Sequence, residues 1–204
     1  MEWNIPLFEG QLIYLASINP DKDAEMESRW THDAEFQRLL NPDLVRPLSP
    51  AQIKKIYTEI EKEMDEKRNQ FYFTIRRLPT DKSFEAVNEK PQDSDRLLGF
   101  ARLDWIEWSQ GVGSISLGIG EPDERGKGYG SDALRLLLRY AFGELNLFRL
   151  GATVPEYNQV ALRFLGKAGF EVEACRREAL HRGGKRWDLI HLGLLREEWE
   201  QNEW

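Results

Sequence analysis

The chain has 204 residues, 41% of them hydrophobic, which fits one domain with a core or a domain with an added subregion. No run approaches the ~20 apolar residues of a membrane helix, and the first residues lack the basic start and apolar stretch of a signal peptide. The formal charge of -7 argues against general nucleic-acid binding, where Lys and Arg neutralise phosphates. It favours a cationic partner, although solubility alone also explains it. Because Cys175 is the only cysteine, we expect no intrachain disulfide, no cysteine zinc site and a cytoplasmic location.

The first half of the chain predicts two strands, two helices and a long connection. Residues 10–17 read as a strand, and a polar helix follows over 21–30. Ser49 before Pro50 is a helix cap with proline at the first helical position, and this helix runs to about Lys67. The alternation in 71–76 is that of a strand. Residues 78–95 are polar and contain two prolines, so we expect a long, mobile loop.

The second half predicts strands that alternate with helices. In the helix over 131–142, apolar residues recur at i, i+3, i+4 and i+7, and the helix over 158–168 has a similar apolar face that ends at Gly169. The strands expected around these helices cover 97–105, 112–119, 147–154, 170–180 and 187–195. This order predicts an α/β (α+β) fold with a mixed sheet of about seven strands, in one domain over 1–204.

Residues 125–130, Arg-Gly-Lys-Gly-Tyr-Gly, form a glycine-rich loop between a strand and a helix. Glycines remove side chains where the helix start has unpaired N–H groups, and they permit the positive φ values that turn those groups inward. Arg125 and Lys127 add positive charge. The loop therefore predicts a phosphate or pyrophosphate site, although a plain glycine-rich turn is also compatible with these six residues alone.

Two common phosphate loops are excluded by spacing. The Walker A pattern requires Gly, four residues and then Gly-Lys-Ser/Thr, whereas Gly126-Lys127 is followed by Gly128 and preceded, five residues earlier, by Glu121. The dinucleotide fingerprint G-x-G-x-x-G fails as well, because the spacing here is G-x-G-x-G and the loop comes late in the chain.

The loop resembles the acyl-CoA loop of the GNAT acetyltransferase superfamily, Arg/Gln-x-x-Gly-x-Gly/Ala, through Arg125, Gly128 and Gly130. The next helix resembles the second signature of that superfamily, Asn-x-x-Ala ending in Lys-x-Gly-Phe. Its matching residues are Asn158, Ala161, Lys167, Gly169 and Phe170. The segment 21–33, with Arg29, Trp30 and Asp33, resembles the RimJ/RimL-like subgroup, so the resemblance covers nearly the whole chain except 78–95.

The resemblance implies an N-acetyltransferase whose sheet is splayed in the middle and whose co-substrate is acetyl-CoA. Pantetheine would insert beside the strand that ends at Ile119, whose backbone N–H would polarise the thioester carbonyl. A primary amine, on a protein N-terminus or a small molecule, would attack directly. The implied cofactor-binding residues are Leu117, Gly118, Ile119, Arg125, Gly126, Lys127, Gly128, Tyr129, Gly130, Ser131 and Asn158. Asn158 has the alternative role of a helix N-cap.

The sequence departs from the family at the acid–base positions. Leu165 stands where many relatives have a tyrosine acid, Ala161 where RimL-like members often have a serine, and Ser114 where some have a glutamate base. General acid–base catalysis contributes about 10²–10⁴-fold and positioning about 7–11 kcal/mol, so we still expect an active enzyme. The alternative is a catalytically degenerate module that binds acyl-CoA and acts through a partner. Exposed sheet edges are also compatible with a homodimer.

Other polar residues are weaker candidates for the site. Glu107 lies near the end of a strand that could border the cleft, but it fits better as a solvated surface carboxylate. Glu173 lies on the strand after the second helix, and it fits better as a structurally paired carboxylate. Asp188 fits best as a partner of backbone or arginine groups. The histidines His32, His181 and His191 lack metal-ligand spacing, so we predict no metal and assign them no chemistry.

Overall fold

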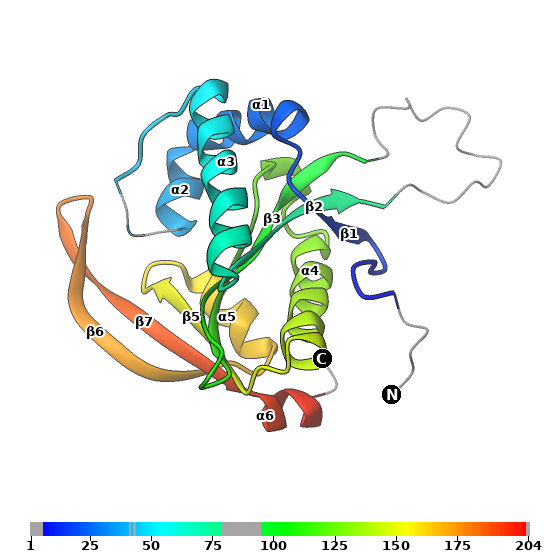
Figure 1. Cartoon of the computed structure of the whole chain (residues 1–204). Helices are drawn as coiled ribbons and strands as arrows, with labels where there is room; N and C mark the ends of the chain where they lie inside the picture. Colours follow the sequence, from blue (N-terminus) through cyan, green and yellow to red (C-terminus); the bar gives the residue numbers. More distant parts are fainter. Residues whose placement is uncertain (1–5, 41, 43, 79–94, 203–204) are drawn as a thin grey trace.

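A computed structural model describes residues 6–40, 42, 44–78 and 95–202. The expectation of a mobile loop over 78–95 falls almost entirely outside these residues. Seven strands form one mixed sheet in the order β1-β2-β3-β4-β5-β7-β6 (Figure 1). Their bounds are β1 Ile13–Ala16, β2 Phe71–Arg77, β3 Leu97–Glu107, β4 Val112–Ile119, β5 Arg149–Pro155, β6 Glu171–Arg182 and β7 Lys185–Leu195. The predicted mixed sheet of seven strands is thus confirmed.

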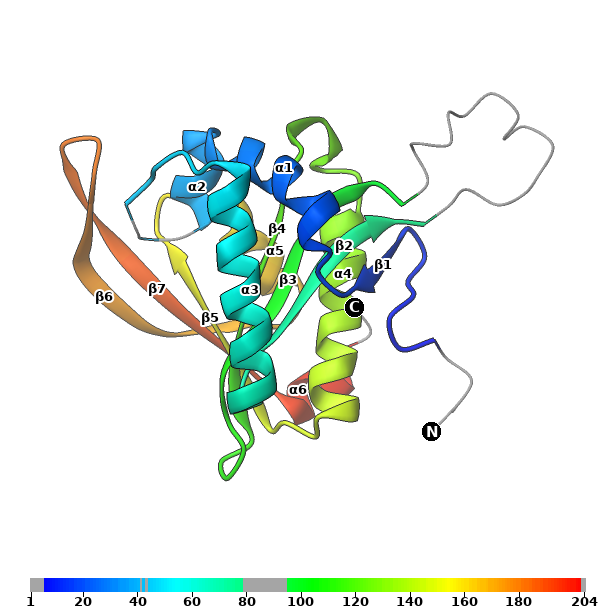
Figure 2. The ribbon, with the colours of Figure 1, turned by 45° about the horizontal axis from the view of Figure 1, so that its top comes forward.

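Helices cover both faces of the sheet and enclose two clusters of buried side chains. On one face, α4 (Tyr129–Leu138) and α5 (Gln159–Lys167) pack over a large core that includes Leu134, Leu138 and Leu165. On the other face lie α1 (Pro20–Thr31), α2 (Ala34–Leu40) and α3 (Pro50–Lys67) (Figure 2). These helices enclose a smaller cluster of buried side chains around Trp30 and Tyr57. The short α6 (Arg196–Gln201) follows β7.

Local capping explains where the helices begin. Ser49 caps α3 through the N–H of Gln52, and the Gln52 side chain accepts from the N–H of Ser49, which makes a reciprocal capping box. Asn19 caps α1 through the N–H of Lys22 at 3.2 Å. These two helices match the predicted ranges closely because their start signals are local in sequence.

Most predicted strand bounds lie within two residues of those in the structure, but one strand and one helix differ more, and two short helices are new. The first strand is shorter than 10–17, and α4 starts two residues before Ser131 and passes at Arg139 into a π-helical turn that ends at Glu144. The helices α2 and α6 were not predicted, because each spans only seven or six residues and shows less than two turns of periodicity.

The sheet splits between its two parallel strands. Strands β4 and β5 pair through three positions only, Val112 with Arg149, Gly113 with Leu150 and Ser114 with Gly151. Beyond Ser114, β4 continues to Ile119 against β3 alone, while β5 continues to Pro155 against β7 alone. The two strands therefore diverge and leave a V-shaped gap, as the resemblance implied.

Candidate active site

The gap between β4 and β5 exposes backbone groups of β4. The N–H of Gly120 donates to the carbonyl of Leu98 at 2.9 Å, which fixes the hydrogen-bonding register of β3 and β4. Because the direction of these groups alternates along an antiparallel strand, the N–H and C=O of Leu117 and Ile119 point away from β3, into the gap. Those of Gly118 point toward β3. A ligand strand in the gap would thus meet Leu117 and Ile119.

Gly118 serves the site by its missing side chain instead. A Cβ atom at Gly118 would lie 3.1 Å from Cζ of Phe36 and 3.3 Å from Cδ1 of Leu40, both on α2. Side chains on alternate residues of a strand point to opposite faces, so Leu117 and Ile119 face α4, where their side-chain carbons approach Gly130. The glycine lets α2 pack closely against the end of β4.

The glycine loop places free backbone donors beside this gap. Gly128 stands at the N-cap of α4 with φ 91°, and no side chain caps the helix. Within the described part of the chain, the N–H groups of Gly128, Tyr129, Gly130 and Ser131 have no hydrogen-bond acceptor. A helix start with unpaired donors attracts anions. Gly126, at φ 76°, has nothing within 4 Å of its Cβ position, so the approach to the loop is open.

The two cations of the loop are already paired in the protein. Arg125 donates from Nε to the carbonyl of Ile119 at 3.0 Å, and its terminal nitrogen donates to Gly120 O at 2.8 Å and Asp33 Oδ2 at 3.0 Å. Lys127 pairs with the buried Glu124 at 2.9 Å. These contacts fasten the loop to the end of β4, so the backbone N–H groups supply more of the attraction for an anion than the sequence suggested.

Asp33 holds Arg125 from the α1–α2 connection. Partial burial opposes ionisation of Asp33, but hydrogen bonds from the N–H of Phe36 and from Arg125 outweigh it and lower the pKa of the carboxyl group. The guanidinium carbon of Arg125 lies 4.8 Å above the ring of Phe36, a cation–π contact. Sequence reasoning placed Asp33 in the subgroup resemblance but did not identify it as the partner of the loop arginine.

Asn158 and Tyr129 have structural roles for their side chains. The Oδ1 atom of Asn158 caps α5 by accepting from the N–H of Ala161 at 3.0 Å, and Nδ2 donates to the carbonyl of Leu39 on α2 at 3.0 Å. The side chain of Tyr129 is buried in the large core. Only the backbone of Tyr129 remains available to a ligand.

The positions that usually supply acid and base do not do so here. Leu165 is 6% exposed and belongs to the core, and Ala161 packs against that core. The hydroxyl of Ser114 donates to the carbonyl of Gly151 at 3.3 Å and so joins the two strands where they begin to diverge. The side chains of Leu165 and Ala161 cannot transfer protons, and Ser114 acts as a strand link.

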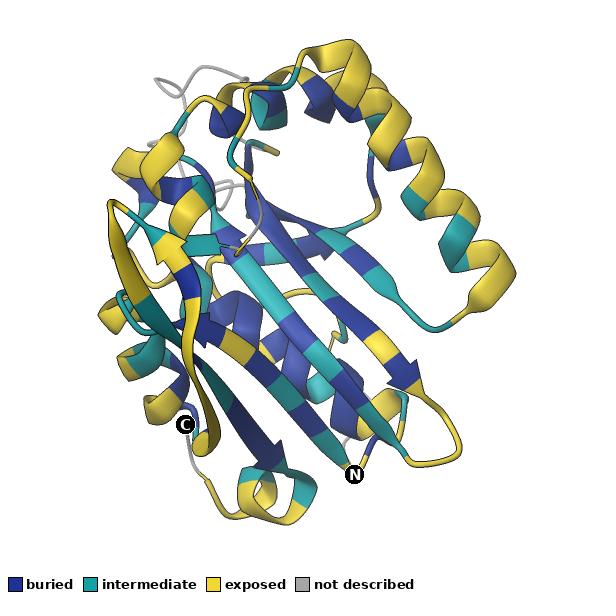
Figure 3. Cartoon of the chain, turned by 90° about the vertical axis from the view of Figure 1, so that its left-hand side faces the viewer, coloured by how far each residue is buried: buried dark blue, intermediate teal, exposed yellow. Residues whose placement is uncertain are grey.

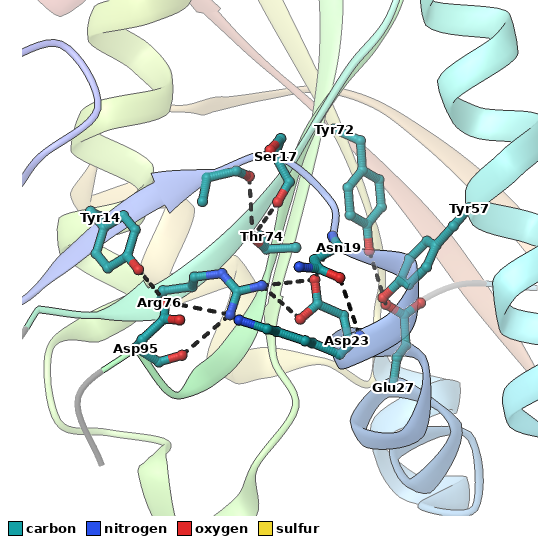
Figure 4. Close-up of polar contacts among 12 residues, drawn as sticks. Tyr14, Ser17, Asn19, Asp23, Glu27, Tyr57, Tyr72, Thr74, Arg76 and Asp95 are labelled. Carbon is teal, nitrogen blue, oxygen red and sulfur yellow. Dashed lines mark hydrogen bonds and ion pairs between the residues drawn. The ribbon is translucent and has the colours of Figure 1, made fainter. Parts of the chain in front are cut away.

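A buried polar network lies between α1 and β2 on the face opposite α4. Glu27 accepts hydrogen bonds from the hydroxyl groups of Tyr57 and Tyr72, and Figure 4 shows all three side chains converging from α1, α3 and β2. Burial raises the pKa of Glu27 despite these two donors. Next to it, one terminal nitrogen of Arg76 donates to both carboxylate oxygens of Asp23, at 2.6 and 2.8 Å. No sequence motif signalled this network, because its members come from three separate segments.

The structure separates the two weaker carboxylate candidates. Glu107 pairs with Val112 at the opposite end of β4 from the gap, so it does not border the site. Glu173 pairs with Arg149, and its carboxylate occupies the space in which a side chain at Gly193 would lie. Gly193 pairs with Gly151 at the vertex of the gap, so Glu173 lies near the site.

Two absences hold for residues 6–40, 42, 44–78 and 95–202. No helix there combines the length and apolarity needed to cross a membrane. No three His, Cys, Asp or Glu side chains in those ranges lie close enough together to hold a metal ion.

Comparison with known proteins connects this geometry to one family. The family model described as "Acetyltransferase (GNAT) domain" matches residues 13–171. YnaD, an uncharacterized N-acetyltransferase of Bacillus subtilis, is 35% identical over 78 residues, which cover 38% of this chain and 46% of YnaD. YdaF, a putative ribosomal N-acetyltransferase of the same organism, is 36% identical over 75 residues, 37% of this chain and 41% of YdaF. The chain thus spans less than half the length of these two relatives.

The fold also matches a solved structure. The spermidine N-acetyltransferase from Vibrio cholerae, solved with CoA and spermine, superposes with a TM-score of 0.75 over 92% of this chain and 98% of that chain. The two sequences are 16% identical, so this likeness concerns the fold.

Proposed function

The chain belongs to the GNAT acetyltransferase family, and on that premise we propose that it transfers the acetyl group of acetyl-CoA to a primary amine. The observation that carries the proposal is the set of unpaired N–H groups at the start of α4, from Gly128 to Ser131, beside the gap between β4 and β5. This combination fits a long ligand with an anionic end and an extended arm. Acetyl-CoA has both, in its pyrophosphate and its pantetheine.

The residues present fit the parts of acetyl-CoA. The pyrophosphate would accept hydrogen bonds from the N–H groups of Gly128 to Ser131, with Gly126 leaving space and Arg125 and Lys127 bordering the loop. The amide groups of pantetheine would pair with the backbone of Leu117 and Ile119. Asn158 lies at the start of the next helix, and the amide hydrogen that it does not donate to Leu39 would donate to the pantetheine arm.

The chain supplies electrostatic help at the thioester. The N–H of Ile119 points into the gap, where it would donate to the carbonyl oxygen of the thioester and stabilise the negative charge that develops there. The N–H of Ile119 shares its peptide plane with the carbonyl of Gly118, which points toward β3, so the pairing of β3 with β4 orients this N–H before a ligand arrives. Acetyl-CoA supplies the activated acetyl group, and the protein supplies alignment and charge stabilisation.

The proposed acceptor is a cationic primary amine, on a protein N-terminus or on a small polyamine. The name of YdaF and the resemblance to the RimJ/RimL-like subgroup support a protein N-terminus. The spermidine acetyltransferase, whose fold is shared, supports a small polyamine. The net charge of -7 favours either kind of cation over an acidic acceptor.

A catalytically degenerate acyl-CoA-binding module is the second candidate. It is favoured by one observation, that Leu165, Ala161 and Ser114 leave the usual acid and base positions without a proton-transfer group. The two candidates differ in turnover and share cofactor binding.

The test measures thiol release from acetyl-CoA with spermine, spermidine and tripeptides that have free N-termini, and it measures binding separately by thermal shift. We expect acetyl-CoA to stabilise the protein and one class of amine to release CoA. Gly126→Asp should weaken acetyl-CoA binding at least tenfold relative to Gly126→Ala. Both variants strain the positive φ of 76°, but only the first adds a charge in the open space beside the pyrophosphate.

Three results separate the candidates. Stabilisation with acceptor-dependent release supports the enzyme. Stabilisation without release by any amine favours the binding module. No stabilisation at millimolar acetyl-CoA, or equal binding by the Gly126→Asp and Gly126→Ala variants, contradicts the assignment of the loop.

A further inference from the structure

Helix α2 crosses the gap between β4 and β5 on the face of the sheet opposite α4. Over β4, its side chains Phe36 and Leu40 lie against Gly118, where an added Cβ atom would meet them at 3.1 and 3.3 Å. At its carboxyl end, the carbonyls of Arg38 and Leu39 accept hydrogen bonds from residues that follow β5. The helix therefore contacts both the half of the sheet that ends at β4 and the half that begins at β5.

Three donors from the β5 half bind the carboxyl end of α2. The hydroxyl of Tyr157 and Nδ2 of Asn158 reach the two carbonyls just named, at 2.7 and 3.0 Å. Arg182, near the tip of the β6–β7 hairpin, donates to the carbonyl of Pro42 at 2.6 Å. Figure 3 looks at the molecule from the side where this hairpin projects, and most residues of β6 are exposed. The last carbonyls of a helix lack partners within it, so these outside donors stabilise its end.

The amino end of α2 is bound to the glycine loop. Asp33, directly before the helix, pairs with Arg125 at 3.0 Å, and the ring of Phe36 lies 4.8 Å from the guanidinium carbon. Arg125 and Asn158, which hold the two ends of the helix, are both residues of the proposed cofactor site. Because a helix of seven residues is marginal by itself, its position depends on such contacts.

The gap depends on a bridge of this kind because its two strands pair so briefly. Both strands lie wholly within the described residues, and they share no ladder pair beyond Ser114. Ile119 ends β4 farther along, roughly 16–17 Å from Ser114 at about 3.3 Å per residue. Packing on the two faces of the sheet therefore sets the spacing of the gap at Ile119. Displacing a reacting group by about 1 Å can lower a rate by about 10²-fold.

We propose that Tyr157 and Arg182 are positioning residues of the acetyl transfer, which hold α2 across the gap, and that α2 couples acetyl-CoA binding to the acceptor side. This inference rests on the proposed function. The pantetheine arm would take the second amide hydrogen of Asn158 and so fix the side chain that binds α2. The docked helix in turn forms an apolar wall beside the thioester position at Ile119.

The coupling has a definite sign. Acetyl-CoA binds better to the protein with α2 docked than to the protein with α2 detached, because only docking holds Asn158 and Arg125 in place. By linkage, acetyl-CoA then favours docking by the same factor by which docking favours acetyl-CoA. Detachment of the helix weakens cofactor binding and removes the wall on the acceptor side, so it changes both Kd and kcat.

The first experiment measures hydrogen exchange of the α2 amides by mass spectrometry in the full chain, with and without acetyl-CoA. Tyr157→Phe keeps the ring against Trp187, at 5.4 Å, and removes one neutral hydrogen bond, so exchange in α2 should rise about threefold to tenfold. Arg182→Met should do the same, whereas Arg182→Lys keeps a cationic donor and should stay within about twofold of the wild type. In the wild type, saturating acetyl-CoA should slow this exchange about fivefold or more.

Two control variants change the same residue types away from α2. Tyr14→Phe removes a hydroxyl hydrogen bond to Asp95 from the edge strand β1, and Arg176→Met removes an exposed arginine from the same hairpin. Neither should alter exchange in α2 or the binding of acetyl-CoA.

A second experiment separates positioning from stability, at a temperature well below Tm. We expect the double variant Tyr157→Phe/Arg182→Met to raise the Kd for acetyl-CoA about threefold or more and to lower kcat with spermine or a tripeptide about tenfold or more. Residues that only stabilised the fold would lower Tm in this variant and leave both constants of the folded enzyme at their wild-type values.

The inference is overturned if exchange in α2 stays at the wild-type rate in either single variant, or if it does not respond to bound acetyl-CoA. A double variant with Kd and kcat within about twofold of the wild type would overturn it too. If thermal shift shows no binding of acetyl-CoA, the proposed function fails, and exchange in the single variants alone decides whether Tyr157 and Arg182 hold α2. If acetyl-CoA binds but no amine is acetylated, Kd and exchange decide it.

Discussion

The buried ion pair between α1 and β2 offers the sharpest test of the physical account. Arg76 is 8% exposed and Asp23 1% exposed at their side chains, and the two are joined by bonds of 2.6 and 2.8 Å. Asp23 also accepts from the N–H of Asn19 at 2.8 Å. We take Asp23→Asn as the perturbation, because it keeps the shape and an acceptor for Asn19 but removes the charge.

The expected loss follows from the burial of Arg76. Removing one partner of a buried pair costs about 3–5 kcal/mol, since the other charge stays in a poorly solvated place. A carboxylate oxygen of Asp95 lies 3.6 Å from the second terminal nitrogen of Arg76, which puts the loss at the lower end, about 3 kcal/mol. Unfolding entropy of about 2.1 cal/mol/K per residue gives roughly 0.43 kcal/mol/K here, so Tm should fall by about 7 °C.

Thermal unfolding followed by circular dichroism measures this shift, with two variants for comparison. Asp21→Asn removes the charge of an ion-paired but exposed aspartate on the same helix, so its Tm should stay at the wild-type value within error. The double variant Asp23→Asn/Arg76→Met removes both charges and should recover at least half of the loss. A fall below about 2 °C in the single variant, or a double variant no better than the single, would refute the reasoning.

Three further predictions concern separate parts of the molecule. Burial raises the pKa of Glu27, so the folded state binds its proton more tightly than the unfolded state, and the stability from this group falls as pH rises above about 4.5. In urea unfolding, the free energy of unfolding of Glu27→Gln relative to the wild type should therefore be higher at pH 7.5 than at pH 4.5. A difference that stays constant between the two pH values would contradict this. A Cβ at Gly120 would lie 2.0 Å from the ring of Trp30, so Gly120→Ala should cost about 1–3 kcal/mol and change Trp30 fluorescence, whereas an unchanged Tm would show that the ring moves freely. The hydrogen bond from Cys175 to Asp188 raises the pKa of the thiol, so Cys175 should be alkylated more slowly than free cysteine at pH 8, and Asp188→Asn should accelerate it. Equal alkylation rates in that variant and the wild type would refute the last prediction.

Local signals in the sequence predicted much of the fold. The strand 112–119 and the helices after Ser49 and Asn158 matched the structure closely, because caps, prolines and apolar periodicity act within a few residues. The short helices α2 and α6 were not predicted from the sequence, because packing against the rest of the protein stabilises them more than their own sequence does.

In the candidate site, too, the features set by local spacing were predicted and the contacts between distant segments were not. The glycine spacing in 125–130 was enough to predict a loop with free N–H groups before a helix, and the structure has such a loop. The sequence could not show that Arg125 is bound to Asp33 and the carbonyl of Ile119, because these partners lie on three different segments. The charge of the loop was therefore overestimated.

The sequence by itself determined the order of the elements, the position of the glycine-rich loop and the absence of proton-transfer groups at Leu165 and Ala161, because each of these depends on residue type and local spacing. Only the tertiary structure decided where β4 and β5 separate, which backbone groups of β4 face the gap, and that Tyr157 and Arg182 bind the end of α2. The physical reason is that strand register and divergence arise from packing of the whole sheet between its helices, and contacts between distant residues have no signal in local sequence.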